Sequence, residues 1–162
     1  MRSEFGRFLT KRMWYISLMK ATVVILLLFC LTMYNAGANQ RNDTPPAFMM
    51  GKFKDDYQIK YTINDTLWIQ EPRTKFHIIK WNTDKQYLIA RNDAKNPGDA
   101  NLYTRIDYMT FKDMGEWKWG YCLTAYKAET NAAAEATAAA DHDNPKKGCG
   151  GYPFSRMMVV GN

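Results

Sequence analysis

Between residues 57 and 126 the chain alternates short apolar and polar runs that are separated by turn-forming residues. Tyr57, Ile59, Tyr61 and Ile63 alternate with polar residues, which is the two-residue period of a half-buried strand, and Asn64-Asp65 supplies a turn. Further strands are predicted over residues 67–70, 76–81, 86–91, 102–111 and 117–126. The segments between them are short and rich in Asn, Asp, Pro and Gly, so the strands are expected to form an antiparallel meander.

This pattern predicts a mainly β domain of six or seven strands, either a small barrel or a strongly curved sheet. Closure of the sheet removes exposed strand edges and is therefore favoured. On the last strand one face carries the apolar residues Trp117, Trp119, Tyr121, Leu123 and Ala125. These side chains either fill the core or line an apolar ligand cavity, and the pattern leaves both interpretations open.

The segment after this strand has a different composition. Residues 127–140 are rich in alanine and poor in β-branched residues, which predicts one short helix; a low-complexity linker is the alternative. The tail over residues 148–157 combines three glycines with Tyr152 and Phe154. Glycines permit tight turns and the two aromatic rings can anchor the chain, so we expect a packed cap.

The first 38 residues resemble an export signal. An uncharged apolar run over residues 21–34 follows five basic residues and precedes Ala36-Gly37-Ala38, as in a secretory signal peptide. As a helix the run would be about 21 Å long, shorter than the roughly 30 Å of a bilayer core, so an uncleaved anchor is the weaker alternative. We expect a signal peptide over residues 1–38, with Met19 as an alternative start. A flexible linker over 39–47 and a single domain over 48–162 would follow.

Cleavage after Ala38 would also remove Cys30 and leave Cys122 and Cys149 as a pair. Because exported chains are oxidised, we predict a disulfide between these two residues, which would close a loop of about 28 residues and contribute on the order of 3.5 kcal/mol. Two free thiols are the alternative, and a metal site is disfavoured because no histidine lies at ligand spacing. Lipidation of Cys30 is disfavoured because Phe29, which precedes it, is not small.

Most of the positive charge belongs to the leader. The chain carries 22 basic and 16 acidic residues, but five of the basic residues and one acidic residue precede Asn39, so the remainder has a net charge of about +2. The candidate basic positions Lys52, Lys54 and Lys60 are interleaved with Asp55, Asp56 and Asp65 in the sequence. A nucleic-acid partner is therefore not expected, since phosphate binding requires a basic stripe.

Few residues suggest catalysis. The two histidines are His77, in a predicted strand, and His142, between two aspartates, and neither has a second ligand at metal spacing. Arg105 and Asp107 lie two residues apart on one strand face. They either orient a polar ligand group inside the barrel or form a salt bridge at its surface or mouth. No cofactor or metal is predicted, and no pair of titratable groups indicates an enzyme.

Gly51-Lys52-Phe53, at the start of an antiparallel meander that ends in a helix and a disulfide-tied tail, resembles the lipocalin and wider calycin barrels. That family begins with a Gly-x-Trp motif and holds small apolar ligands, and Phe53 replaces the tryptophan here. The runs Trp119-Gly120-Tyr121-Cys122 and Gly148 to Phe154 are similar to the ends of small exported bacterial proteins without an assigned function. This similarity implies a location at the bacterial envelope.

The sequence thus predicts an exported β-domain, in the periplasm, at the cell surface or outside the cell, that binds a small apolar or amphipathic ligand. The candidate ligand residues are Arg105, Asp107, Trp117, Trp119 and Tyr121. A structural or protein-interaction module of the envelope is the alternative, with an envelope protein as partner. Contact with a membrane is expected only through an uncleaved leader.

Overall fold

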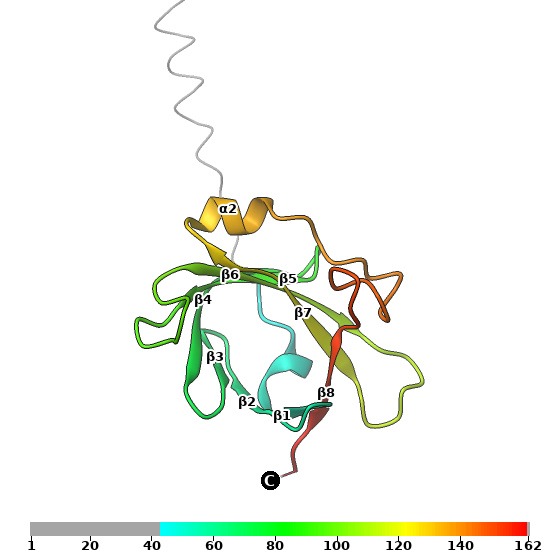
Figure 1. Cartoon of the computed structure of the whole chain (residues 1–162). Helices are drawn as coiled ribbons and strands as arrows, with labels where there is room; N and C mark the ends of the chain where they lie inside the picture. The colour runs from blue at the N-terminus through cyan, green and yellow to red at the C-terminus, as the bar shows by residue number, and fades with distance from the viewer. Residues whose placement is uncertain (1–42, 162) are drawn as a thin grey trace, which may run out of the picture. The chain divides into compact units, whose positions relative to one another are not determined.

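The computed structural model describes residues 43–161 of the chain, and within them eight strands form a closed antiparallel barrel (Figure 1). The predicted signal peptide, Cys30 and the first part of the predicted linker lie outside the described residues. The elements in chain order are η1 (Ala47–Met49), β1 (Gly51–Asp55), β2 (Lys60–Ile63), β3 (Leu67–Gln70), β4 (Thr74–Asn82), β5 (Tyr87–Asn92), β6 (Tyr103–Thr110), β7 (Trp119–Ala128), α2 (Asn131–Ala136) and β8 (Ser155–Val159).

Consecutive strands pair along the barrel, and β1 pairs with β8 to close it. The predicted mainly β fold and its closure are confirmed, but the expected count of six or seven strands was too low for the described chain. The two strands that the pattern missed are β1 and β8, which pair with each other through Phe53 opposite Val159 and Asp55 opposite Met157. β1 carries charged residues at three of its five positions, and β8, with the sequence Ser-Arg-Met-Met-Val, has two adjacent methionines. Neither strand therefore shows a clear alternation of apolar and polar residues.

The predicted tail cap is present in part: residues 155–157 belong to β8 and Phe154 is buried, whereas Tyr152, the other expected anchor, is 75% exposed. A tight turn leads into the strand. Cys149 and Tyr152 form an isolated bridge, and Gly150 and Gly151 between them both have positive φ angles, of 59° and 94°. Glycine adopts such angles without steric strain. The turn redirects the chain so that Ser155 pairs with Tyr121 of β7 at the start of β8.

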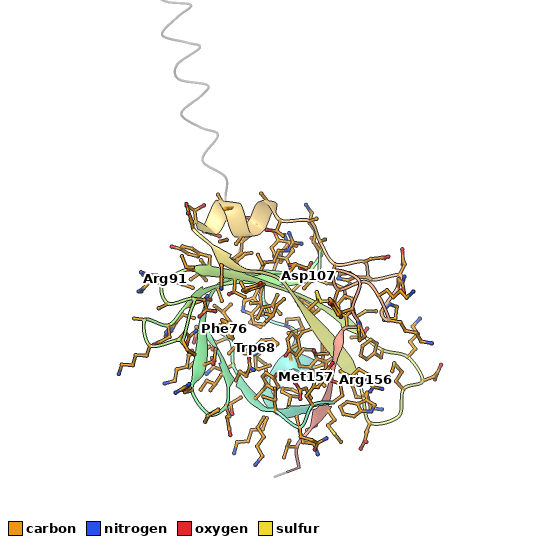
Figure 2. All side chains as sticks on the ribbon, in the orientation of Figure 1. Trp68, Phe76, Arg91, Asp107, Arg156 and Met157 are labelled. Carbon is orange, nitrogen blue, oxygen red and sulfur yellow. A yellow bond between two sulfur atoms is a disulfide. The ribbon has the colours of Figure 1, made fainter. Side chains whose placement is uncertain are left out.

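Side chains alternate between the two sides of the barrel wall. Trp68, Phe76 and Met157 point inward, whereas Arg91 and Arg156 point outward (Figure 2). The interior is filled by one cluster of large apolar residues: Met49, Phe53, Tyr61, Ile63, Trp68, Phe76, Ile78, Trp81, Leu88, Ala90, Ile106, Tyr108, Trp119, Tyr121 and Met157. Burial of this aromatic surface is the main stabilising contribution to the fold.

Two details of the predicted strands differ in the structure. Tyr57 was expected at the start of the first predicted strand, but it lies in the β1–β2 turn and is 67% exposed. Ala125 was expected on the aromatic face of β7, but the register with β6 is irregular there and Ala125 lies opposite Arg105. Directly opposed residues share a face, so this bulge moves Ala125 to the side of the wall that Arg105 occupies.

The chain before β1 enters the barrel. η1 lies within the ring of strands in Figure 1, and Met49 is fully buried. Asp43, which falls in the predicted linker 39–47, accepts hydrogen bonds from the amide and the hydroxyl of Thr83, at 2.9 and 3.0 Å. Residues 43–49 are thus attached to the β4–β5 turn at one end and to the core at the other.

The predicted helix is present but shorter than residues 127–140. β7 continues to Ala128, which pairs with Tyr103, and Thr130 then caps α2 by accepting a hydrogen bond from the amide of Ala133. The helix ends at Ala136, and Thr137 is extended. Strand pairing outweighs helix propensity at its start because tertiary contacts routinely override that weak preference. α2 lies on the outside of the barrel over β5, β6 and β7 (Figure 1).

The predicted disulfide between Cys122 and Cys149 is confirmed, with its Cα atoms 5.5 Å apart. It joins the outer face of β7 to the chain just before β8. Ala140 and Phe154 pack around it in a small apolar cluster on the outside of the barrel. The bridge therefore holds the segment that leads into the closing strand.

Candidate functional site

The five residues predicted to contact a ligand lie on two sides of the barrel wall. Trp119 and Tyr121 point into the interior and are 1% and 8% exposed. Arg105 and Asp107 lie on the outer face under α2, and Trp117 precedes β7. The structure therefore brings Trp119 together with Tyr121 and Arg105 together with Asp107, but it does not bring all five to one place.

The interior aromatic rings pack edge to face around Trp68 and Trp119. Trp68 lies 6.0 Å from Trp119 and 5.1 Å from Tyr121, measured between ring centres, and Phe53 lies 5.2 Å from Trp119. All three contacts are T-shaped, the geometry that aromatic quadrupoles favour. These flat, polarisable rings pack against one another and fill this part of the interior.

One interior polar group is fully hydrogen-bonded. The hydroxyl of Tyr61 donates to the carboxylate of Asp55 at 2.8 Å and lies 2.8 Å from the hydroxyl of Tyr121. Asp55 is 1% exposed and its other oxygen accepts from the amides of Tyr57 and Ile59. Burial, followed by the neighbouring Tyr121, raises the pKa of Tyr61, and burial raises the pKa of Tyr121 to about 12. Both phenols therefore stay neutral at physiological pH.

Two other interior polar groups have no partner within residues 43–161. These are the hydroxyl of Tyr108 and the indole N–H of Trp119. Tyr108 lies opposite Tyr121 and Trp119 lies opposite Thr110 on the paired strands β6 and β7, so the two are diagonal neighbours on the inner face. Burial raises the pKa of Tyr108 to about 12, and the negative charge of Asp43 acts in the same direction.

One ring of η1 packs against both aromatic side chains. Phe48 lies 6.3 Å from Tyr108 and 6.1 Å from Trp119, measured between ring centres, and it remains 40% exposed. Met49 beside it is fully buried. A three-residue 3₁₀ turn is a small unit, held here by its own side chains and by the bonds of Asp43 to Thr83.

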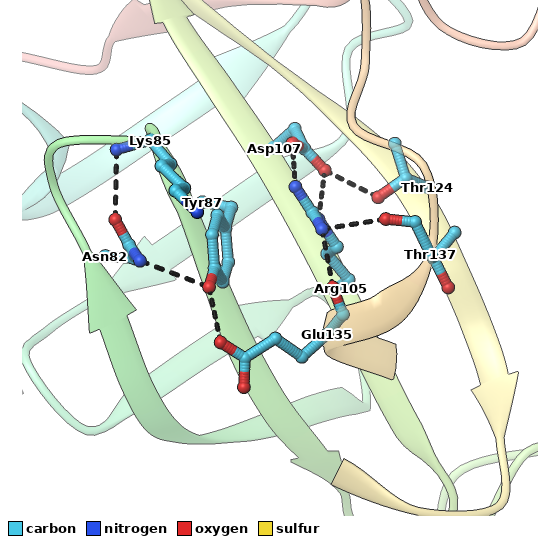
Figure 3. A network of polar contacts seen from close by, with 8 residues as sticks. All are labelled: Asn82, Lys85, Tyr87, Arg105, Asp107, Thr124, Glu135 and Thr137. Atoms are coloured by element: carbon cyan, nitrogen blue, oxygen red, sulfur yellow. Dashed lines mark hydrogen bonds and ion pairs between the residues drawn. The ribbon is translucent and has the colours of Figure 1, made fainter. Parts of the chain in front are cut away.

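On the outer face, Arg105 and Asp107 form a bidentate ion pair (Figure 3). Arg105 Nε and Nη2 donate to the two carboxylate oxygens of Asp107, both at 2.9 Å. The remaining nitrogen, Nη1, donates to the carbonyl oxygens of Glu135 and Thr137, and Thr124 donates to Asp107. The pair forms a salt bridge, but α2 covers it and leaves Arg105 5% and Asp107 0% exposed, so it is buried rather than at the surface or mouth that the sequence offered as the alternative. A role for this pair in ligand binding stays a prediction.

The same face carries a second polar group that attaches α2 (Figure 3). Glu135 accepts a hydrogen bond from the hydroxyl of Tyr87 at 2.6 Å, as Figure 3 shows. It also accepts one from Lys80. The guanidinium carbon of Arg105 lies 4.2 Å from the ring centre of Tyr87. Donation from Lys80 and Tyr87 lowers the pKa of Glu135 below its usual range. These contacts fasten the helix to β4, β5 and β6.

The remaining sequence candidates lie apart from the interior. Trp117 is half-buried and stacks with Arg156, whose guanidinium carbon is 5.1 Å from the ring centre. His77 is hydrogen-bonded to Asp93 at 2.8 Å on the surface, and His142 packs beside Phe154 in the tail. Within residues 43–161 no group of three or more histidine, cysteine or acidic side chains is arranged to hold a metal ion.

Two open depressions lie on the barrel. One, of about 280 Å³, adjoins the disulfide between β7 and residues 137–140. The other, of about 320 Å³, is formed at β1 and β2 by Lys52, Phe53, Lys60, Tyr61, Glu71, Val160 and Gly161. Neither is enclosed, so each is a groove on the protein rather than a chamber inside it.

Comparison with known proteins identifies no relative. No protein-family model matches the chain, and neither a curated protein nor a solved structure was found to match it. The class that the structure defines is a closed antiparallel barrel with one external helix and a disulfide. No helix in the described part of the chain is both long enough and apolar enough to cross a bilayer.

Sequence reasoning missed Tyr108, Tyr61 and Phe48 as site residues. A signal for Tyr108 was available, because Thr104, Ile106 and Tyr108 alternate with Arg105 and Asp107 and form the more apolar face of that strand. Tyr108 should therefore have been assigned to the inward face of β6. Phe48 had no such signal, since η1 is a single turn at the predicted boundary between the linker 39–47 and the domain 48–162.

Proposed function

We propose that this protein is an exported, lipocalin-like barrel that binds a small apolar or amphipathic ligand in its interior. Export is supported by the resemblance of residues 1–38 to a signal peptide and by the disulfide, which oxidising compartments favour. The ligand would lie among Trp119, Tyr121 and Tyr108, on the aromatic inner face of β6 and β7.

The observation that carries this proposal is the pair of buried, unpartnered groups on Tyr108 and Trp119. Buried polar groups are almost always hydrogen-bonded, and one that is not costs about 1–3 kcal/mol. An acceptor on a ligand that replaces the ring of Phe48 would satisfy both groups. Phe48 is the partly exposed side chain that contacts both rings, and it belongs to a single 3₁₀ turn, so it can move with little loss of core packing.

The two groups also restrict the ligand's chemistry. An indole N–H can only donate, so the ligand must present an acceptor at that position. Asp43 contributes negative charge near Tyr108, which disfavours an anionic acceptor. We therefore expect a neutral carbonyl, ether or alcohol oxygen on a flat apolar body that packs against Trp68 and Trp119.

Native mass spectrometry of the purified full chain, with denatured protein as reference, tests the proposal. We expect an adduct that is lost on denaturation, and quenching of tryptophan fluorescence when apolar ketones or alcohols are added. Tyr108→Phe removes only the hydroxyl and should weaken binding about 2- to 10-fold, the effect of one neutral hydrogen bond. Tyr152→Phe, at a 75% exposed ring in the tail, is the matched control and should bind normally.

A protein-interaction module remains the second candidate, and the packed interior favours it. Fifteen buried side chains fill the barrel as it stands. Tyr57, Tyr126 and Tyr152 are more than half exposed and could contact an envelope protein. If the chain binds none of the probes and Tyr108→Phe changes only stability, this candidate replaces ligand binding.

A further inference from the structure

The lysines that alternate with aspartates in the sequence lie together on the folded protein. Lys52 and Lys54 of β1 and Lys60 of β2 occupy outward positions, because Phe53, Asp55 and Tyr61 between or beside them are buried. Lys54 and Lys60 are direct partners across the two strands. Side chains at such positions are roughly 5 Å apart at Cβ.

The aspartates that seemed to neutralise these lysines are directed elsewhere. Asp55 points into the barrel and binds Tyr61, and Asp56 pairs with Arg156 at 3.0 Å. Asp65 lies in the β2–β3 turn. None of the ion pairs found within residues 43–161 involves Lys52, Lys54 or Lys60. The lysines and aspartates that are interleaved in the sequence therefore point in different directions in the folded protein.

A like-charge pair at directly opposed positions destabilises a sheet. The chain retains such a pair on β1 and β2, beside the open groove of about 320 Å³ that Lys52 and Lys60 line with Val160 and Glu71. Glu71 is the acidic side chain among the lining residues; its amide donates to the carbonyl of Lys60, and none of the ion pairs found within residues 43–161 includes it. This face lies on the side of the barrel opposite α2, which carries Glu135 (Figure 1).

We propose that the outer face of β1 and β2, formed by Lys52, Lys54 and Lys60, binds a linear sulfated or carboxylated polysaccharide. Three cations on two adjacent strands are complementary to the repeated anionic groups of such a chain. The open groove beside these lysines leaves room for a polymer chain to lie against them. The inference rests on the export part of the proposed function, which brings the protein into contact with extracellular or envelope glycans, and it is independent of the interior site.

Heparin is the probe, used with the full oxidised chain in calorimetry at low and physiological salt. We expect binding that weakens as salt rises, because exposed charges are screened. Lys52→Glu combined with Lys60→Glu should weaken binding by about tenfold or more, taking roughly 1 kcal/mol per cation removed from an anionic surface. Lys85→Glu combined with Lys95→Glu makes the same change in net charge on exposed turns elsewhere and should alter binding less than about twofold.

A stability measurement separates loss of binding from loss of folding. Lys60→Glu removes the like charge opposite Lys54 but adds one beside Glu71, whose amide donates to the Lys60 carbonyl, so this variant should unfold at nearly the wild-type temperature while binding heparin more weakly. Equal loss in both double variants, or unchanged binding by the Lys52/Lys60 variant, would overturn the proposal. So would tighter binding to vesicles that contain phosphatidylserine than to heparin. Ligand binding in the interior is measured separately, by quenching of tryptophan fluorescence. This quenching should be unchanged in the Lys52/Lys60 variant.

Discussion

Tyr61 and Tyr108 offer a direct test of the interior, because the same mutation should have opposite effects at the two positions. Both rings are buried, at 1% and 2% exposure, and both point into the barrel. Tyr→Phe removes one hydroxyl from each and leaves the ring. The Tyr61 hydroxyl is hydrogen-bonded to Asp55 and Tyr121, whereas the Tyr108 hydroxyl has no partner within residues 43–161.

The expected magnitudes follow from these partners. Tyr61→Phe removes a hydrogen bond to a buried carboxylate, which is worth about 1.5–3 kcal/mol, so the free energy of unfolding should fall by that amount. Tyr108→Phe removes a buried group that is desolvated without compensation, so the free energy of unfolding should rise by about 1 kcal/mol. The two variants should therefore differ by roughly 3 kcal/mol, which is more than 100-fold in the unfolding equilibrium.

Urea denaturation followed by tryptophan fluorescence measures both effects, and the slope of the transition serves as the control. Equal slopes for wild type and variants show that each mutation changes stability rather than the compactness of either state. A loss of stability in Tyr108→Phe as large as that in Tyr61→Phe would refute the argument. It would mean that the Tyr108 hydroxyl is hydrogen-bonded in solution, and the main support for an interior ligand would be lost.

Three further outcomes are expected, each measurable by thermal or urea denaturation. Cys149→Ser should lower the free energy of unfolding by about 3–4 kcal/mol, because the bridge to Cys122 spans 27 residues; an effect below about 1 kcal/mol would contradict this. Gly148→Ala should destabilise the tail strongly, since a Cβ there would lie 2.0 Å from the carbonyl oxygen of Asp141, whereas Gly161→Ala, where a Cβ would meet no atom within 4 Å, should be neutral. Glu135 has a folded-state pKa below its ordinary value of about 4.5, so its contribution to stability is present above that pH and is lost as the pH falls through the folded-state pKa. Glu135→Gln should reduce this acid-side loss, and an unchanged pH profile would contradict it.

The strands that alternate cleanly were predictable, and those that do not were missed. Residues 67–70, 76–81 and 102–111 were placed to within two residues because one face of each strand is apolar. β1 and β8 depend on each other for pairing, at opposite ends of the domain. Local pattern contains no information on such distant partners, so closure of the barrel could be expected but the strands that achieve it could not be assigned.

The candidate site was predicted in part for the same reason. Trp119 and Tyr121 were found because they lie on a regular apolar face. Ala125 was placed wrongly because a bulge, which leaves little trace in the sequence, reverses the alternation after Leu123. The hydrogen-bonded state of Tyr61 and the unpartnered state of Tyr108 depend on contacts across the barrel, which no local pattern encodes.

The central claim is that the barrel interior of an exported, oxidised protein holds a small ligand, and native mass spectrometry of protein secreted through its own pathway tests it most directly. The account predicts a chain that begins at Asn39, lacks two hydrogens because of the disulfide, and carries a neutral adduct that is lost on denaturation. The adduct should be weaker or absent in Tyr108→Phe and Trp119→Phe. A cleaved, oxidised chain with no adduct, and no uptake of apolar ketones or alcohols, would contradict ligand binding; an intact leader would contradict export by cleavage.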